Sequence, residues 1–130
     1  MKFYIASRLG NFAQVQALSE KLKVAGWVHT YDWTTHGSVK ESDVDQLKEV
    51  AWNEYNGVKD ADVIVVLLPG GKGTHAELGM AIAFGKKVYL CHINDTYFKC
   101  DNNTCAFYWL PQVKQFVGGI DDVVGELLGE

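Results

Sequence analysis

The chain has 130 residues, of which 48% are hydrophobic and 22% charged, and its formal net charge is −4 at pH 7. This composition is ordinary for a soluble globular protein, and the length predicts a single domain over residues 1–130. The acidic balance, without a run of lysine or arginine, argues against a nucleic-acid polymer or an anionic membrane as the main partner. No apolar run reaches the roughly 20 residues of a bilayer span, and the N-terminus does not resemble a signal peptide, so we expect a cytoplasmic protein.

The first half of the chain alternates between strand and helix patterns. Residues 2–7 predict a strand, and Asn11 is placed to cap a helix that ends at Gly26. The alternating segment 27–33 predicts a second strand, followed by a polar loop over residues 34–41. Ser42 is then the expected cap of a long helix whose apolar residues share one face and are expected to be buried: Val44, Leu47, Ala51, Tyr55 and Val58.

The second half continues the alternation. Residues 60–68 form a continuous aliphatic run, typical of a strand that helices cover on both faces. Beyond a glycine-rich turn, the pattern predicts a helix over 75–85, a strand over 86–93, an irregular loop over 94–110, a short strand within 112–119 and a helix over 120–129.

This order indicates a doubly wound, flavodoxin- or Rossmann-like α/β fold, with about five parallel strands and helices on both faces. Ligands of such folds bind outside the carboxyl ends of the strands. Three segments reach that edge: residues 7–10, 34–38 and 69–77.

Three cysteines lie in the last third of the chain, at positions 91, 100 and 105. An odd number without an export signal argues against a disulfide framework. A zinc site made by these thiols with His92 is an alternative, although the spacing is not that of the tight paired motifs.

The segment PGGKGTHAE, residues 69–77, has the composition of a ligand-binding turn. Gly70, Gly71 and Gly73 allow a sharp turn, positive φ angles and close approach of a ligand to the backbone. The free N–H groups of the following helix favour an anion such as a phosphate or a carboxylate. The segment matches neither the Walker A loop nor the GxGxxG fingerprint, which argues against a dinucleotide oxidoreductase.

Glu77 has two interpretations that local spacing does not separate. Thr74 and Glu77 fit a capping box, in which each side chain binds the other residue's backbone N–H. Alternatively, the glutamate is a reactive carboxylate that the helix N-terminus keeps ionised.

A longer stretch resembles a known family. PGGKGTHAELGMAIAFGKKVYL, residues 69–90, is similar to the signature of the nucleoside 2-deoxyribosyltransferases and their relatives, the deoxynucleoside 5′-monophosphate N-glycosidases. Residues 3–10 and 54–69 resemble the family's first strand and its pre-signature helix and strand. The resemblance implies an enzyme that cleaves or exchanges the N-glycosidic bond of a (deoxy)nucleoside or its 5′-monophosphate. It also implies no cofactor and a homo-oligomer, a dimer or larger.

The same resemblance assigns roles to individual residues. Glu77 matches the nucleophile, which would stabilise an oxocarbenium-like transition state and form a covalent glycosyl intermediate. Glu54 falls where the family has an aspartate that orients the sugar, and Tyr4 falls near its first-strand aromatic residue. The remaining expected substrate-binding residues are Ser7, Arg8 and Gly10 at the 5′ end, and Gly70, Gly71, Gly73, Thr74 and His75 in the turn.

Two features of this site are left open. Many relatives carry an aspartate or serine six residues before the nucleophile, where this chain has Gly71, so the group that contacts and protonates the base is unassigned. Arg8, the only arginine, suits a 5′-phosphate, although an exposed surface arginine is the alternative.

Several other residues have competing interpretations. His75 and His36 are candidates for ligand contacts, whereas His29 is expected to be structural and Asp62 to bind backbone at the start of its strand. The aromatic residues Phe107, Tyr108 and Trp109 could stack on a base, or belong to the core or an interface.

Two alternative functions remain at this point. The turn also fits PGGxGTxxE, the signature of the cytokinin-activating phosphoribohydrolases, but their second glycine-rich motif is not found. In the second alternative, the chain is a nucleotide-binding sensor without turnover, in which the turn holds a phosphate and Glu77 caps a helix.

Overall fold

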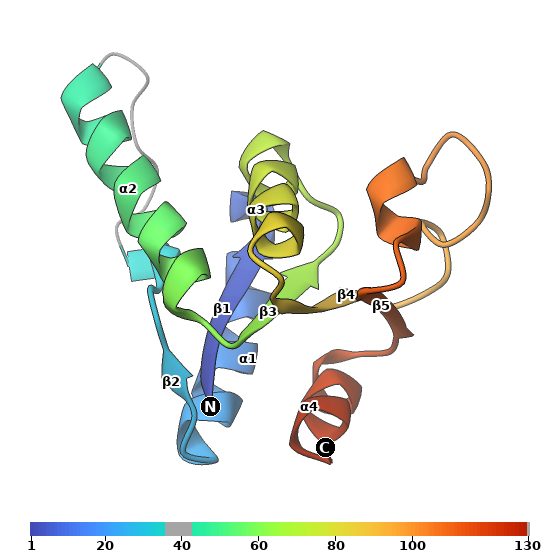
Figure 1. Cartoon of the computed structure of the whole chain (residues 1–130). Helices are drawn as coiled ribbons and strands as arrows, with labels where there is room; N and C mark the ends of the chain where they lie inside the picture. The colour runs from blue at the N-terminus through green and yellow to red at the C-terminus, as the bar shows by residue number, and fades with distance from the viewer. Residues whose placement is uncertain (36–42, 130) are drawn as a thin grey trace.

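The computed structural model describes residues 1–35 and 43–129 (Figure 1). Its sheet has five strands, all parallel, in the order β2-β1-β3-β4-β5. The strands are β1 (Lys2–Ser7), β2 (Val28–His29), β3 (Val63–Leu67), β4 (Lys87–His92) and β5 (Val113–Val117). The predicted doubly wound α/β fold is therefore confirmed.

Helices cover both faces of this sheet. They are α1 (Phe12–Val24), α2 (Val44–Asp60), α3 (Lys72–Ala83) and α4 (Ile120–Leu128). Helix α1 packs with α4 on one face, and α2 packs with α3 on the other. The strand order reverses direction between β1 and β3, which is the switch point where folds of this class bind ligands.

The core lies around β3, the central strand. All five of its residues are buried, which confirms the covered strand predicted from its aliphatic run. At its start, Asp62 accepts a hydrogen bond from the backbone N–H of Lys2 at 2.9 Å, as predicted. His29 stacks on Phe3 with 4.5 Å between ring centroids and bonds the hydroxyl of Ser19, which confirms its structural role.

The second strand is shorter than predicted, two residues instead of seven. After His29 the chain leaves the sheet and forms a short 3-10 helix, η2 (Trp33–Thr35). The indole of Trp33 donates to the carbonyl of Ile5 on β1 at 2.8 Å, so this aromatic residue packs against β1 instead of extending the second strand.

The prediction of a buried face along α2 is wrong for its first half. Val44 is 59% exposed and Leu47 37% exposed, and Ala51 is also exposed, whereas Val58 is fully buried. Figure 1 shows the reason: the N-terminal end of α2 extends away from the sheet. The predicted cap, Ser42, lies outside the described residues, as does His36, and Asp43 caps α2 by accepting from the N–H of Gln46 at 3.0 Å.

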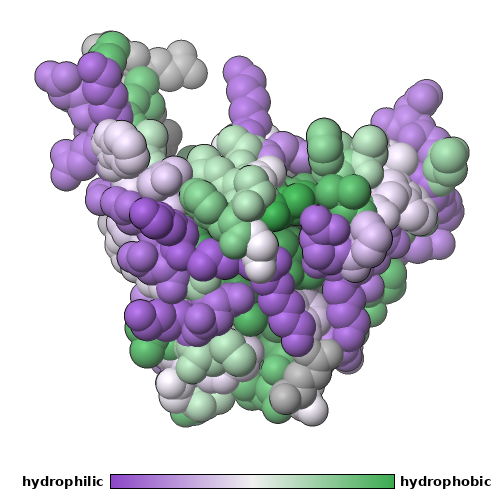
Figure 2. Space-filling view, in the orientation of Figure 1, coloured by the Kyte–Doolittle hydropathy of each residue, from purple (hydrophilic) through white to green (hydrophobic). Residues whose placement is uncertain are grey.

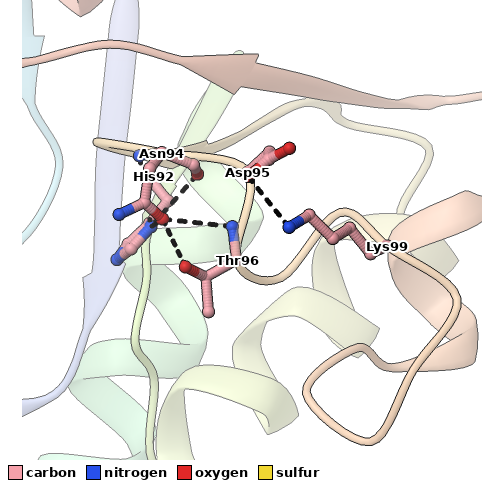
Figure 3. A network of polar contacts seen from close by, with 5 residues as sticks. All are labelled: His92, Asn94, Asp95, Thr96 and Lys99. Carbon is pink, nitrogen blue, oxygen red and sulfur yellow. Dashed lines mark hydrogen bonds and ion pairs between the residues drawn. The ribbon is translucent and has the colours of Figure 1, made fainter.

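Residues 94–110 form the predicted irregular segment between β4 and β5, ending in a 3-10 helix, η3 (Ala106–Trp109). A polar network holds its beginning (Figure 3). The side-chain oxygen of Asn94 accepts hydrogen bonds from the backbone and hydroxyl of Thr96, and it contacts His92. Lys99 pairs with Asp95 at 3.6 Å. Tyr97, Phe98 and Leu110 then pack this segment onto the core.

The three cysteines are free thiols, in agreement with the expected lack of a disulfide framework. Cys91 is buried, and Cys100 is exposed. Within residues 1–35 and 43–129, no three His, Cys, Asp or Glu side chains are grouped to hold a metal ion, so the zinc alternative gains no support. No helix in the same ranges is long and apolar enough to span a membrane.

Candidate active site

Glu77 is a buried carboxylate in the middle of the fold. It is the sixth residue of α3 and only 5% exposed. Its Oε2 accepts a hydrogen bond of 2.8 Å from the hydroxyl of Tyr4, whose ring is fully buried on β1. Burial in this way makes the carboxyl group costly to ionise, which marks Glu77 as a candidate functional residue.

Glu54 joins this pair from α2. A close contact sets its position: a Cβ at Gly57 would come within 2.9 Å of the ring of Tyr4 and of Cβ of Tyr31. The glycine therefore lets α2 lie directly on β1, and Glu54, one turn earlier, reaches Glu77 by a side-chain hydrogen bond. Tyr4, Glu54 and Glu77, predicted separately, thus form one cluster between α2 and α3.

The electrostatics of the cluster differ from the expectation of a permanently ionised nucleophile. Burial, followed by the nearby charge of Glu54, raises the pKa of Glu77 to about 8. The hydrogen bond from Tyr4 acts in the opposite direction and lowers the pKa. Burial also raises the pKa of Tyr4, so its hydroxyl remains a donor. Glu77 therefore holds its proton near neutral pH in the free enzyme, beside the carboxyl group of Glu54.

The capping-box interpretation of Glu77 is wrong. Helix α3 begins at Lys72 with Gly71 as its N-cap, three residues before the predicted start. The hydroxyl of Thr74 accepts from the backbone N–H of Gly71 at 3.1 Å. Glu77 lies almost one turn beyond Thr74, and its carboxylate binds Tyr4 instead of a backbone N–H of the first turn.

None of the three glycines of the turn has a positive φ, and close packing requires a glycine only at position 70. In the described residues the positive-φ glycines are Gly26 and Gly85, outside the turn. A Cβ at Gly70 would approach Cγ2 of Thr74 to 2.5 Å, so any side chain there would displace the first turn of α3. Gly71 and Gly73 are exposed, and the preceding Leu68–Pro69 peptide is cis.

The loop after β1 lies beside this turn. Arg8 is exposed, and its guanidinium lies over Gly10, where a Cβ would be 3.5 Å from Nε. A Cβ at Gly71 would be 4.0 Å from Cβ of Arg8, so the two loops meet. The Arg8 head group is therefore available to an anion at the carboxyl edge of the sheet.

Ser7 and Asn11 cross-link these two loops. The hydroxyl of Ser7 donates to the carbonyl of Leu67 at 2.7 Å. The amide of Asn11 donates to the hydroxyl of Ser7 and to the carbonyl of Pro69, each at 2.9 Å. Asn11 stands at the N-cap position of α1 but makes no side-chain capping bond. Sequence reasoning therefore gave Asn11 a helix cap and missed that it holds the site's two loops together.

His75 points away from Glu77, toward η3. Its ring nitrogens lie 2.8 Å from the carbonyl of Gly71 and 2.7 Å from the hydroxyl of Tyr108. Tyr108 is buried, whereas its neighbours Phe107 and Trp109 are exposed. The sequence offered no signal for this pair, since the two residues are 33 positions apart.

A cavity of about 420 Å³ opens at the same edge of the sheet but on the α1/α4 side. Its walls come from the ends of β3 and β4, the N-terminal turn of α1 and the start of α4: Asn11, Gln14, Leu67, Leu68, Pro69, Cys91, His92, Ile93, Gly118, Gly119, Ile120 and Val123. None of these residues belongs to the Tyr4–Glu54–Glu77 cluster.

Comparison with known proteins decides between the families considered above. The sequence profile described as nucleoside 2-deoxyribosyltransferase matches residues 3–114. The chain belongs to the nucleoside 2-deoxyribosyltransferase family. Membership of this family makes the chain an enzyme, and a small nucleoside-like substrate is consistent with it. Among curated proteins, none matches the chain at a significant level.

Solved structures share the fold at low sequence identity. A CMP N-glycosidase of Clostridium botulinum, BcmB, aligns with a TM-score of 0.65 and 19% identity over 98% of each chain. The 2-deoxyribosyltransferase of Bacillus psychrosaccharolyticus aligns with a TM-score of 0.69 and 20% identity, covering 95% of this chain and 90% of that one. A conserved protein of Enterococcus faecalis V583 aligns at 0.64 and 18% identity over 99% and 98%.

Proposed function

We propose that this family member cleaves or exchanges the N-glycosidic bond of a (deoxy)nucleoside or its 5′-monophosphate, and that Glu77 is the nucleophile. The observation that carries the proposal is the buried Glu77 carboxylate, held by Tyr4 and next to Glu54. A glutamate with only a structural role at this position would lower the free energy of unfolding, because no cation among the described contacts balances its burial.

The chemistry follows from the charge that develops on the sugar. As the bond from C1′ to the base lengthens, C1′ becomes positive, and a carboxylate on the opposite face stabilises it and then bonds to it. Positive charge next to Glu77 favours its ionised form, so the reacting sugar opposes the effect that raises the pKa in the free enzyme. The covalent glycosyl–Glu77 intermediate would be resolved by water in hydrolysis or by a second base in transfer.

Glu54 and Tyr4 have supporting roles in this proposal. Tyr4 fixes one oxygen of Glu77 by its hydrogen bond and Glu54 is the second partner, so the carboxyl group is oriented before it attacks. Glu54 is hydrogen-bonded to Glu77 and would orient a sugar hydroxyl or take up the proton when Glu77 ionises. Glu54 is half-buried on α2, at the side of the helix that faces the cluster, and this position suits both tasks.

The 5′ end of the substrate is assigned to the two loops at the carboxyl edge of the sheet. Arg8 supplies a guanidinium there, and the first turn of α3 presents backbone N–H groups close by. Thr74, Gly70, Gly71 and Gly73 shape that turn, and Ser7 and Gly10 shape the loop that carries Arg8. A phosphate at this place would make the substrate a nucleotide.

A homo-oligomer, a dimer or larger, is part of the proposal. The uncovered first half of α2 supports it, since Val44, Leu47 and the 63% exposed Trp52 are apolar side chains left open to solvent on an otherwise mostly hydrophilic part of the helix. Light scattering after gel filtration would measure the molar mass, and a mass of 14.5 kDa would contradict this part.

One assay tests the central proposal. Free base is measured by chromatography after incubation with nucleosides and 5′-monophosphates, ribo and deoxy, with and without an acceptor base. We expect wild type to release base and Glu77→Gln to lose at least about a thousandfold of that rate while remaining folded. Glu20→Gln, the same substitution at an exposed position of α1, is the matched control and should keep the wild-type rate.

The same panel separates the alternatives. Arg8→Gln should raise KM for 5′-monophosphates about tenfold or more and change KM for nucleosides little. Nucleotides that raise the melting temperature without any base release would instead indicate the sensor without turnover. Equal base release by wild type and Glu77→Gln would contradict the role of Glu77.

A further inference from the structure

In the turn that precedes α3, side chains bind both backbone groups of Gly71, its N–H and its carbonyl. The backbone N–H of Gly71 donates to the hydroxyl of Thr74 at 3.1 Å. Its carbonyl accepts from the backbone N–H of His75 at 3.2 Å and lies 2.8 Å from Nδ1 of the same residue. The His75 side chain thus adds a second hydrogen bond to the first one of the helix.

The hydrogen-bond partners fix the tautomer of the neutral His75 ring. A carbonyl oxygen can only accept, so Nδ1 carries the hydrogen that is donated to Gly71. Nε2 is then the acceptor, and the hydroxyl of Tyr108 donates to it at 2.7 Å. Burial raises the pKa of Tyr108 to about 12, which keeps the hydroxyl protonated and able to donate. A directional chain results, from the Tyr108 hydroxyl through the imidazole to the Gly71 carbonyl.

Tyr108 is a rigid anchor for this chain. The residue is 3% exposed, and its ring lies nearly parallel to the imidazole, with 5.8 Å between centroids. Gln115 of β5 donates to the carbonyl of Tyr108 at 3.0 Å, and the backbone N–H of Tyr108 bonds the carbonyl of Cys105. The polar network of Figure 3 holds the other end of the same segment to β4.

The surface view agrees with a continuous packed region here. In Figure 2, apolar surface gathers in the middle of the molecule, over α3 and toward η3, whereas the projecting end of α2 is mostly hydrophilic. The segment 94–110 contacts the helix that carries Glu77 through the His75–Tyr108 pair, although it contributes no carboxylate to the cluster.

We propose that His75 and Tyr108 are positioning residues that hold the Gly70–Gly71 turn in the conformation that receives the 5′ end of the substrate. The inference rests on the proposed function, because it needs a substrate whose 5′ group meets this turn beside Arg8. Through the pair, residues 94–110 become part of the determinants of substrate affinity. His75 is thereby assigned to the support of the backbone, not to direct contact with a phosphate or a base.

The test compares steady-state constants for a 5′-monophosphate and for the matching nucleoside. Tyr108→Phe keeps the ring and removes only the donor, so the fold is preserved and the chain of hydrogen bonds is broken. We expect KM for the monophosphate to rise roughly three- to tenfold, with kcat within about twofold and KM for the nucleoside little changed. His75→Ala should have at least the same effect.

Two controls make the result specific. Tyr97→Phe removes a hydroxyl from the same segment, where the ring packs edge-on against His92 at 4.8 Å, and it should leave all constants unchanged. In the double variant, Tyr108→Phe should add nothing to the effect of His75→Ala, because the hydroxyl acts through the imidazole.

The outcomes separate this inference from the proposed function. If wild type releases no base from any substrate of the panel, the proposed function fails. If wild type turns over but Tyr108→Phe lowers only the melting temperature, or changes KM equally for both substrates, the positioning role is wrong. Additive effects of the two variants would likewise overturn the chain through His75.

Discussion

At the carboxyl edge of the sheet, the two faces carry different features: a cluster of titratable side chains on the α2/α3 face and an open cavity on the α1/α4 face. Between α2 and α3, three titratable side chains are packed together: Tyr4, Glu54 and Glu77. Between α1 and α4, a cavity of about 420 Å³ is open, but its walls are mostly apolar or already hydrogen-bonded. The α2/α3 side therefore carries the candidate site, because a carboxyl group with a strongly shifted pKa is a better guide to function than the volume of a cavity.

The largest expected effect concerns stability. The folded-state pKa of Glu77 is raised to about 8, so the folded chain holds a proton that the unfolded chain releases above about pH 4.5. The contribution of Glu77 to stability is therefore fully present below pH 4.5 and is lost as the pH rises through 8. Glu77→Gln should stabilise the protein by on the order of a few kcal/mol at pH 9 and much less at pH 4.

Urea unfolding at the two pH values measures this difference. Glu20→Gln, at an exposed position of α1, is the control and should show no such pH-dependent gain. A Glu77→Gln variant equally stable relative to wild type at both pH values would mean that the carboxylate is not buried as described.

The next effect is on the pH dependence of catalysis. The charge of Glu54 is the second cause, after burial, of the raised pKa of Glu77. Removing it in Glu54→Gln should move the acidic limb of kcat/KM, expected near pH 8 in wild type, to lower pH. An unchanged limb would show that another group controls the profile.

Tyr4→Phe should act in the opposite direction and by a smaller amount. The lost hydrogen bond is one that lowers the pKa of Glu77, so the acidic limb should move to higher pH. The same pH–rate series measures it. A shift of the same sign as in Glu54→Gln would refute the assignment of these two partners.

The smallest effect is expected on the α1/α4 side. Ile93 lines the cavity and is 64% exposed, so a tryptophan can fill the space without disturbing the core. Ile93→Trp should leave kcat/KM within about twofold of wild type, since the Tyr4–Glu54–Glu77 cluster lies on the other face of the sheet. A loss of more than tenfold would place part of the substrate in the cavity and contradict the comparison above.

Much of the fold could be predicted from the chain itself, for particular reasons. The aliphatic run of β3 and the alternation of strands and helices are properties of periodicity and burial, and they gave the parallel sheet. The errors arose where tertiary contacts override local pattern. Trp33 lies outside the second strand, where its indole donates to the carbonyl of Ile5. The first half of the apolar stripe of α2 extends beyond the sheet, so it is not covered.

The candidate site shows the same division. Glu77, Glu54 and Tyr4 were identified through a resemblance, and their grouping depends on the contact that Gly57 allows, which no local spacing encodes. The predicted capping box was wrong because α3 begins at Lys72, three residues earlier than predicted, with Gly71 as its N-cap. Thr74 therefore binds the backbone N–H of Gly71, and Glu77 lies within the helix instead of at its first turn. The partnership of His75 with Tyr108 depends on the path of residues 94–110 and was not accessible from the pattern.

The central claim, attack by Glu77 on the anomeric carbon, can be tested by trapping the intermediate. A 2′-fluoro-2′-deoxynucleoside destabilises the oxocarbenium-like transition state and slows release of the sugar from the enzyme. Mass spectrometry of the intact protein should then show one added fluorinated pentosyl group, and peptide mapping should place it on Glu77. Base release without any adduct, or an adduct on another residue, would contradict the account.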